Sequence, residues 1–420
     1  MMSQSTSLYK NLQKRYSRRI NLNLSRINQA LIKLDNPHLK LTNPINILGS
    51  DGKMSVLTSL KFFLEADKKK VSAFTSPHLI DFRERFWLAN KYISTKKVRS
   101  LVKIIEREKI KLTLFELLTC VYILAAKELK NTSYNLLESG LLFRKDSTNL
   151  WKNPKLQIVT NINFQHQDWV KPRTLKQICK QKVGSLSKSS TIYIAPQEKN
   201  TLKIIKNILK KNPSKKIYSS NWKIKKLRNN YFYYDKKNKI PIKNKDIISE
   251  ALISNLCLGI KVALDLGVKA DTIKKTIPKI KFRGRVQYIK KGRLCKLLKK
   301  NEKLLIDGCH SEKSAKNLYN YLKTLNEPIF GIWGMQKNKL PKKFLKSFKN
   351  IFKKLITVSI PDEPNALTGI ELKKIASSMK VQAETAENFK QALKKISSSS
   401  KKTIVIFGSL YLIGNVLSKN

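Results

Sequence analysis

Short apolar segments alternate with amphipathic ones along roughly the first 285 residues of the chain. Residues 45–48 form an apolar run, and apolar side chains then recur every three or four residues from Val56 to Leu64, which is helical spacing. Alternation of this kind predicts a parallel-rich sheet covered by helices on both faces. The further elements expected in this part are strands at 71–75, 135–138, 157–162 and 191–195 and a long helix at 113–129.

A second alternation follows the turn Arg283-Gly284-Arg285, where we place a domain boundary. It predicts a smaller, Rossmann-like doubly wound domain. Before the turn, residues 199–245 are rich in Lys and Asn with little periodicity, so we expect irregular surface structure there and a helix at 246–266. The fold class is therefore α/β, with domains at 1–285 and 286–420. The elements expected after the turn are strands at 304–307, 328–333, 355–360 and 403–407 and helices at 314–325 and 372–379.

The composition is that of a globular chain. It has 420 residues, of which 41% are hydrophobic. No run approaches the 18 apolar residues of a membrane span, and the N-terminus lacks the apolar core of a signal peptide. The five cysteines form no Cys-x-x-Cys pair, which is typical of reduced thiols rather than disulfides or zinc ligands. We therefore expect a cytoplasmic protein. We also expect a monomer. The cysteines are Cys120, Cys179, Cys257, Cys295 and Cys309.

The charge is strongly positive, with 86 Lys and Arg against 28 Asp and Glu, a formal net charge of +58. The excess is spread along the chain and is mostly Lys, whereas nucleic-acid binders concentrate charge in a patch with Arg and aromatic residues. This pattern favours a solvated lysine surface, with a dedicated nucleic-acid surface as the alternative. The positive field would also attract anionic substrates.

A glycine-containing segment, 49–55, lies between the first predicted strand and helix. Backbone N–H groups of such a loop and the following helix N-terminus can bind phosphates, while Lys53 neutralises charge and Ser55 faces a metal ion. The spacing between its glycines is two residues shorter than in the common P-loop. The alternative is a glycine-rich connection with an exposed lysine. The candidate phosphate-binding residues are Gly49, Asp51, Gly52, Lys53, Met54 and Ser55.

Further motifs follow this loop in a fixed order. Together with the loop they make the chain resemble the folylpolyglutamate synthase/dihydrofolate synthase family of the Mur-ligase superfamily. The resemblance extends over nearly the whole chain. The motifs are Thr75-Ser76-Pro77-His78-Leu79, Leu112-Thr113-Leu114-Phe115-Glu116, Leu137-Glu138-Ser139-Gly140, Arg144 to Asn149, Thr160-Asn161-Ile162 with His166, Lys182-Val183-Gly184, Gly284-Arg285, Asp307-Gly308-Cys309-His310 and Phe407 to Leu412.

The resemblance implies a P-loop-type ATPase domain followed by a ligase domain. It implies an enzyme that uses ATP and Mg²⁺ to convert a pterin carboxylate, dihydropteroate and/or tetrahydrofolate, into an acyl phosphate. The amino group of L-glutamate then attacks this intermediate. Phosphoryl transfer of this kind depends on positioning and charge neutralisation. The partners expected are these small molecules, with no specific nucleic acid and no membrane.

Residue roles are implied by position in the same motifs. Lys53, Lys182 and His166 would be catalytic, and Asn255, Arg285, Asp307 and His310 would join the loop in binding ATP. The metal ligands would be Ser76, Glu138, His166 and a carbamylated Lys182, a set that suits Mg²⁺ shared with phosphates. The residues implied in binding the pterin substrate are Thr113, Leu114, Phe115, Glu116, Lys145, Asp146 and Ser147.

Each of these residues also has a plainer interpretation. Glu138 could cap a helix, His166 could be an ordinary loop histidine, Lys182 could be one more surface lysine, and Arg285 could form a salt bridge. Because lysine is so abundant in this chain, the position of Lys182 alone does not decide whether it is a metal ligand or a surface lysine.

The chain also departs from the family pattern in a consistent direction. Amides replace carboxylates at Gln165, Gln181 and the Gln336-Lys337-Asn338 segment, and Leu142-Phe143 replaces a glycine pair. An amide keeps the shape of a carboxylate and loses its charge. These changes leave two alternatives: a related ligase for another carboxylate or amino acid, and a catalytically weakened binding protein. A third alternative, a nucleic-acid-binding protein, depends only on the net charge. Retention of the Lys53, Ser76, Glu138, His166 and Lys182 set argues against the second.

Overall fold

The computed structural model describes residues 4–17, 21–228, 230–348 and 350–420. The chain divides into two compact units, of which the first contains Met1–Lys243 and Ile253–Ile280. The second contains Asn244–Leu252 and Lys281–Asn420. The short segment Asn244–Leu252 thus belongs to the second unit although first-unit residues flank it on both sides. The sequence pattern, which places a boundary at 285, gives no signal for this exchange.

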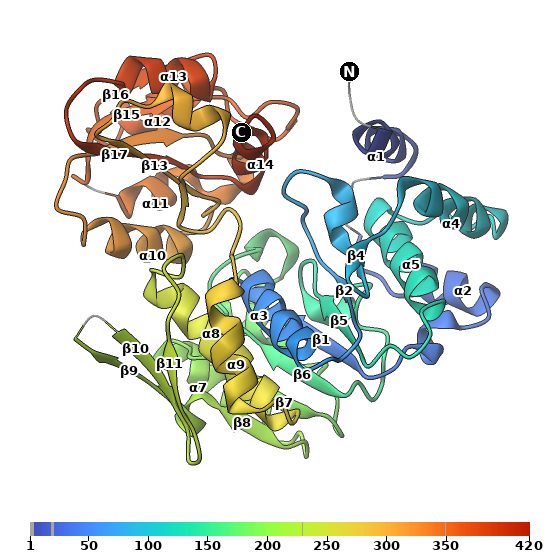
Figure 1. Ribbon diagram of the computed structural model, residues 1–420. Coiled ribbons are helices and arrows are strands. Elements are labelled where there is room, and N and C mark those ends of the chain that lie inside the picture. Colours follow the sequence, from blue (N-terminus) through green and yellow to red (C-terminus); the bar gives the residue numbers. More distant parts are fainter. Residues whose placement is uncertain (1–3, 18–20, 229, 349) are drawn as a thin grey trace. The chain divides into compact units, whose positions relative to one another are not determined.

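The first unit is built on an eight-stranded sheet in the order β4-β3-β2-β5-β1-β6-β7-β8 (Figure 1). The six strands β2, β5, β1, β6, β7 and β8 are neighbours in this order and pair in parallel. At the β2 edge, the hairpin β3–β4 extends the sheet with antiparallel pairing. Every residue of the central strand β1 is buried, as expected for a strand covered on both faces. The four predicted strands and the apolar run at 45–48 are confirmed. The bounds are β1 Pro44–Leu48, β2 Val71–Phe74, β3 Phe86–Leu88, β4 Lys91–Tyr92, β5 Tyr134–Glu138, β6 Leu156–Val159, β7 Thr191–Ile194 and β8 Lys216–Tyr218.

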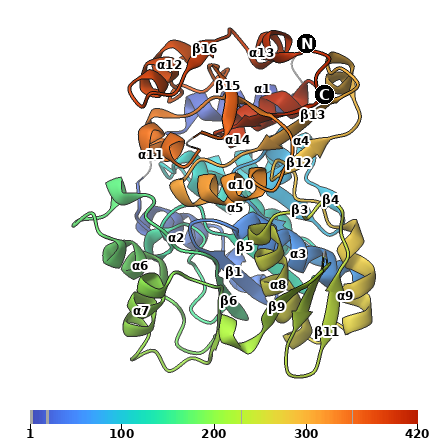
Figure 2. The same cartoon turned by 90° about the vertical axis from the view of Figure 1, so that its left-hand side faces the viewer.

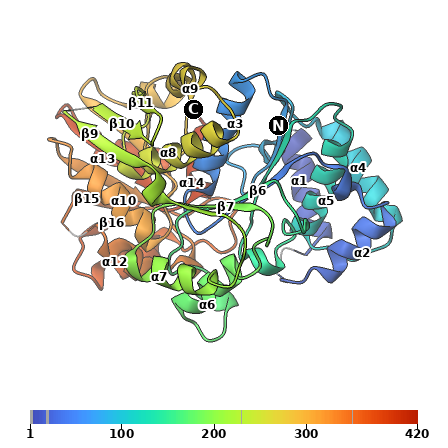
Figure 3. The same ribbon diagram turned by 90° about the horizontal axis from the view of Figure 1, so that it is seen from below.

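Helices cover both faces of this sheet. Figure 3 shows β6 and β7 between α6 and α7 on one side and α3 and α8 on the other, and Figure 2 shows α6 beside α7. One core cluster surrounds α5, which is almost wholly buried, and another lies under α6. The predicted helices at 56–64, 113–129 and 246–266 are confirmed. The helices are α1 Gln4–Arg15, α2 Ser25–Lys33, α3 Lys53–Ala66, α4 Thr95–Arg107, α5 Leu114–Lys127, α6 Leu175–Val183, α7 Lys199–Ile208, α8 Glu250–Asp265 and α9 Ala270–Thr276.

The prediction of irregular structure over 199–245 is wrong. This segment contains α7, β8 and a separate three-stranded antiparallel sheet in the order β11-β10-β9. These elements bury few residues: α7 buries Thr201 and Ile205, β10 fully buries Tyr233, and β9 buries none. Lysines on the exposed faces therefore outnumber the apolar positions and mask their periodicity. The strands are β9 Lys223–Leu227, β10 Asn230–Tyr234 and β11 Lys239–Ile242.

The second unit is a six-stranded sheet in the order β12-β13-β17-β14-β15-β16. All strands except β12 run parallel, which confirms the predicted doubly wound pattern. The strands are β12 Gln287–Ile289, β13 Glu302–Asp307, β14 Ile329–Trp333, β15 Phe352–Thr357, β16 Ala383–Thr385 and β17 Lys402–Phe407. The helices are α10 Glu312–Leu322, α11 Pro341–Lys346, α12 Gly369–Ser377, α13 Phe389–Ile396 and α14 Leu410–Ser418.

The five cysteines are all free. Burial raises the pKa of the Cys120 thiol to about 12 and that of Cys179 to about 11. Thiols of this kind stay protonated near neutral pH and are poor nucleophiles. Within the described ranges, no helix is long and apolar enough to cross a membrane.

Candidate active site

The predicted phosphate-binding loop connects β1 to α3. Gly49 and Gly52 have φ angles of +143° and +91°, which side-chain-bearing residues rarely adopt. A Cβ atom on Gly49 would lie 2.1 Å from Thr160 Oγ1, and one on Gly52 would lie 2.5 Å from Asn255 Oδ1. The loop therefore needs both glycines. The second contact also places Asn255, a predicted ATP-binding residue, directly against the N-terminus of α3.

Two lysine side chains converge on one carbonyl oxygen of this loop. Lys53 Nζ donates to Gly49 O at 3.3 Å and to Ser50 O at 3.1 Å. Lys182 Nζ donates to the same Gly49 O and to Leu141 O, both at 2.8 Å. Lys182 is only 1% exposed, so the interpretation of this residue as a surface lysine is wrong. Its burial, and next the charge of Lys53, lower the pKa of Lys182 to about 7.

The segment that carries His166 is tied to the same loop. Ser50 N donates to Asn161 O at 2.7 Å, and the amide side chains of Asn163 and Gln165 both donate to Asp51 Oδ2, at 2.7 and 3.0 Å. His166 follows with a φ of +63° and begins a short 3-10 turn. The structure thus brings together Asp51 and the His166 segment, although Asn163 and Gln165 lie 112 and 114 residues from Asp51 in the sequence.

Two predicted metal ligands meet at neighbouring strand ends. Ser76 follows β2 and Glu138 ends β5, and Ser76 N donates to Glu138 Oε2 at 3.1 Å. Arg85 Nη1 donates to Ser76 Oγ at 3.0 Å. A hydroxyl and a carboxylate side by side fit Mg²⁺, which takes hard oxygen ligands and often only one or two carboxylates. No group of three or more His, Cys, Asp or Glu residues in the described chain could hold a metal ion by itself.

Asp146 links the two ends of the loop that follows β5. Its buried carboxylate accepts hydrogen bonds from Gly140 N, Leu141 N and Thr148 N at 3.0 to 3.1 Å, and from Thr148 Oγ1 at 2.7 Å. These four bonds give Asp146 a positioning role in the loop, and its contact with the substrate stays a prediction. Its neighbour Lys145 is exposed.

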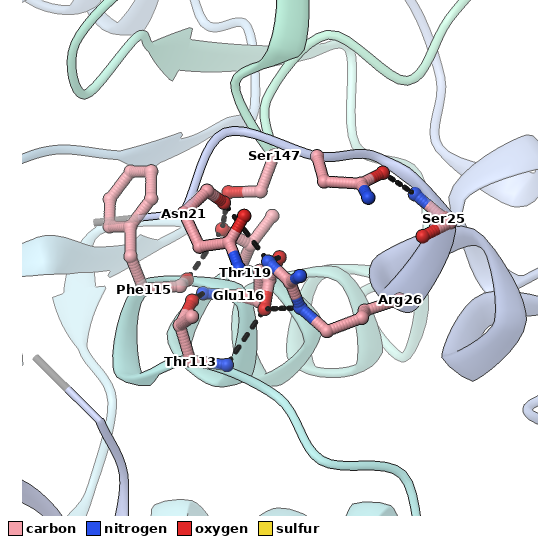
Figure 4. Close-up of polar contacts among 9 residues, drawn as sticks. Asn21, Ser25, Arg26, Thr113, Phe115, Glu116, Thr119 and Ser147 are labelled. Atoms are coloured by element: carbon pink, nitrogen blue, oxygen red, sulfur yellow. Dashed lines mark hydrogen bonds and ion pairs between the residues drawn. The ribbon is translucent and has the colours of Figure 1, made fainter. Parts of the chain in front are cut away.

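The start of α5 contains the other predicted substrate residues (Figure 4). Thr113 and Glu116 form a capping box, and Glu116 also accepts from Arg26 Nε at 3.1 Å and Nη2 at 2.7 Å. The carboxylate of Glu116 is therefore used to hold α2 against α5. A Cβ on Gly140 would lie 2.7 Å from the ring of Phe115, so this ring packs against the loop closed by Asp146. Leu114 is buried at the same helix start.

Replacing Glu116 by alanine should lower the free energy of unfolding by about 3 kcal/mol, because it leaves a largely shielded guanidinium and the Thr113 N–H without their acceptor. Glu128→Ala is the matched control, since its ion pair with Lys97 is exposed and worth about 1 kcal/mol or less. Urea unfolding of both variants measures the difference. Equal losses of unfolding free energy in the two variants would show that the Arg26–Glu116 pair does not stabilise the packing of α2 against α5.

Ser147 has a hydroxyl group against α5, and Ser139 directly precedes Gly140, which packs against Phe115. Ser147 Oγ lies 2.8 Å from Thr119 Oγ1. Ser139 Oγ is one of three buried side-chain polar atoms without a hydrogen-bond partner in the described chain. Strand alternation puts Ser139 on the face of Asn135, whose side chain bonds Tyr122 of α5. A buried, unpartnered hydroxyl beside the predicted pterin segment is a natural hydrogen-bonding group for a ligand.

Ser139→Ala should raise the free energy of unfolding by about 1 kcal/mol, because it removes an unpaired buried hydroxyl. The same change should raise the KM for the carboxylate substrate about threefold to tenfold. Ser59→Ala is the control: the Ser59 hydroxyl is buried but donates to Ser55 O at 2.8 Å, so its loss should destabilise the protein. A destabilised Ser139→Ala variant with unchanged KM would contradict the assignment.

In the second unit, the predicted ATP-binding residues gather at the carboxyl end of β13. Asp307 accepts from Val286 N and Cys309 N, both at 2.7 Å, and His310 Nδ1 lies 2.9 Å from Gly308 O. Burial raises the pKa of Asp307, and the neighbouring Arg285 guanidinium opposes that rise. This is the end of a parallel sheet at which α/β proteins bind ligands.

Two of three further contributors to the site, Arg26 and Asn163, carried no local signal in the sequence. Arg26, Arg85 and Asn163 act through partners that lie 90, 9 and 112 residues away. Arg85 stands in the first domain's motif region, where its charge could have drawn attention to it. Nothing near Arg26 or Asn163 indicates a partner.

Comparison with known proteins places these features in context. Residues 290–419 match the family model "Dihydrofolate synthetase, C-terminal domain". Over 424 residues the chain is 24% identical to the dihydrofolate synthetase of Saccharomyces cerevisiae, covering 95% of this chain and 97% of that protein. It is 23% identical over 417 residues to the dihydrofolate synthase/folylpolyglutamate synthase of Bacillus subtilis, covering 94% of each.

Solved structures of other proteins share the fold, and two of them contain bound ligands that bear on the site. The Escherichia coli FolC protein in complex with DHPP and ADP has a TM-score of 0.84 at 20% identity, covering 99% of this chain and 97% of that one. The bifunctional folylpolyglutamate synthase/dihydrofolate synthase of Yersinia pestis, with Mn, AMPPNP and L-glutamate bound, has a TM-score of 0.83 at 19% identity. That match covers 99% of this chain and 98% of the Yersinia chain.

Proposed function

Because the chain belongs to the folylpolyglutamate synthase/dihydrofolate synthase family, we propose that it is an ATP-dependent ligase. It adds L-glutamate to the carboxylate of a pterin substrate, dihydropteroate and/or tetrahydrofolate. The observation that carries this proposal is the convergence of Lys53 and the buried Lys182 on Gly49 O in a glycine-dependent loop at a helix N-terminus. Such an arrangement suits a polyanion that must be bound and neutralised.

The proposed reaction has two steps. A carboxylate oxygen of the pterin substrate attacks the γ-phosphorus of ATP, and ADP leaves. The glutamate amino group then attacks the acyl carbon, the C–N bond forms, and inorganic phosphate leaves with the electron pair of the C–O bond. The amino group loses a proton. Lys53 and the loop amides hold the phosphates, which is the positioning that phosphoryl transfer requires.

Mg²⁺ would neutralise charge on the phosphates during transfer. Ser76 and Glu138 would hold it, with His166 and, once carbamylated, Lys182. Asn255 would border the nucleotide at the helix start, and Arg285, Asp307 and His310 of the second unit would also contact ATP. In this proposal, residues 1–285 supply ATP binding, residues 286–420 complete the ligase, and the enzyme works as a cytoplasmic monomer.

The proposal is tested by phosphate release from ATP. The purified protein is supplied with dihydropteroate or tetrahydrofolate, each with and without L-glutamate, and the product is identified by mass. Phosphate release that requires both the pterin and glutamate supports it. Phosphate release that does not depend on the pterin, or that requires another amino acid, would overturn the proposal.

One observation favours a second candidate, a related ligase with a different carboxylate substrate. Leu142 and Phe143, which replace the family's glycine pair, are both fully buried in the cluster under α6. Large side chains here reshape the loop that borders the predicted substrate site. Activity with non-pterin carboxylates in the same assay would establish this alternative.

A further inference from the structure

A carboxylate in a phosphate-binding loop needs a compensating interaction, because it repels the ligand that the loop binds. Asp51 is such a residue, one position before Gly52 at the start of α3. Its Oδ2 atom accepts from Asn163 Nδ2 at 2.7 Å and from Gln165 Nε2 at 3.0 Å. The Asp51 side chain is thus held against the 161–165 segment by two amide donors.

The backbone repeats this connection. Ser50 N and Asp51 N both donate to Asn161 O, at 2.7 and 3.2 Å, and Asn163 N donates to Ser50 Oγ at 3.1 Å. Asn163 Nδ2 also donates to Asn161 Oδ1 at 3.1 Å, which fixes the orientation of that amide. Ser50 Oγ also donates to Asn163 O at 3.3 Å. Six hydrogen bonds therefore link two residues of the phosphate loop to a segment that leads directly to His166.

The chemistry of residues 51 and 165 is complementary. A carboxylate is only an acceptor, whereas an amide can both donate and accept. A second carboxylate at 165 would lie about 3 Å from the first and repel it, as like charges do at this separation. The amide at Gln165, a departure from the family pattern, is therefore the residue type that Asp51 requires.

We infer that Asp51 and Gln165 form a positioning pair, which sets the distance between the phosphate loop and the His166 segment. Asn163 supports the pair through the same oxygen. The pair controls how tightly the site binds a nucleotide together with a divalent cation. This inference rests on the proposed function for its ligand. The contact itself can be tested separately.

The test is a double-mutant cycle on the full chain with Gln165→Glu, Asp51→Asn and both together. Gln165→Glu places two carboxylates in contact and should weaken binding of a non-hydrolysable ATP analogue with Mg²⁺ about tenfold, within the coupling seen for touching residues. Asp51→Asn keeps an acceptor oxygen and should change affinity less than threefold. The double variant restores one amide and one carboxylate, so its affinity should return to within about threefold of the parent chain.

Calorimetry with and without Mg²⁺ gives the affinities, and urea unfolding gives the stability of each variant. Gln167→Glu, two residues along, is the control for the added charge and should behave like the parent chain. Additive effects in the cycle, with no rescue, would overturn the pair. If the double variant recovers stability but nucleotide affinity is the same in every variant, the positioning role of the Asp51–Gln165 pair is overturned. A parent chain that binds the nucleotide yet forms no pterin amide would contradict the proposed function and leave this inference standing on its own measurements.

Discussion

Lys182→Ala is expected to lower kcat/KM for amide formation by about 10²–10³-fold or more, comparable to the loss of a preorganised transition-state contact. The substitution removes a buried amine that bonds the phosphate loop at Gly49 O and the substrate loop at Leu141 O. Initial rates at saturating ATP measure the effect. Lys180→Ala is the control, because Lys180 lies on the same helix and is exposed. Near-normal activity in Lys182→Ala would remove this lysine from the mechanism.

The same variant tests carbamylation of Lys182. If a carbamate holds the metal ion, short carboxylates such as acetate should partly restore activity to Lys182→Ala, because they supply the missing oxygen ligand. Lys182→Arg should then stay inactive, since arginine keeps the charge and forms no carbamate under these conditions. A crystal structure with ATP and Mg²⁺ decides between the forms. An amine that still donates to Gly49 O and Leu141 O in that complex would contradict the carbamate.

Lys53→Ala is expected to reduce turnover by a similar factor while the fold stays intact. Its Nζ now lies against two loop carbonyls, at the helix start where phosphates are predicted to bind. Loss of this charge should weaken binding of the ATP analogue as well as turnover, which calorimetry and phosphate release measure together. Lys103→Ala, an exposed lysine on α4, is the control. Unchanged ATP-dependent amide formation in Lys53→Ala would exclude the loop from the mechanism.

The central sheet and the phosphate loop could be predicted from the sequence because their signals are local. An apolar run, a glycine-containing loop and a helical repeat of apolar positions follow one another within about 20 residues. The strand ends at Glu138 and Asp307 are predictable for the same reason, since each acidic residue directly follows a buried apolar run. The hydrophobic pattern was least informative where lysines cover elements with few buried residues, as in α7 and β9.

The hydrogen-bond partners of individual carboxylates could not be predicted in this way. Asp146 and Glu116 stand in segments that resemble substrate-binding motifs, yet their oxygens are occupied by Gly140 and Thr148 in one case and by Arg26 in the other. Which partner a carboxylate takes depends on how distant segments pack, and Arg26 is 90 residues from Glu116. A motif therefore indicates a candidate segment more readily than it indicates the partners that each side chain takes within the protein.

Leu142 and Phe143 give the substrate loop a property that a glycine pair would not. Their side chains are packed with Ile178, Cys179 and Val183 of α6, the helix that carries Lys182. Backbone amides in this loop should therefore exchange with deuterium slowly, because exchange requires opening of the core under α6. A loop that is already ordered loses little conformational entropy when a ligand arrives. Association with the carboxylate substrate should accordingly be fast and show a small entropic penalty, as in a rigid receptor.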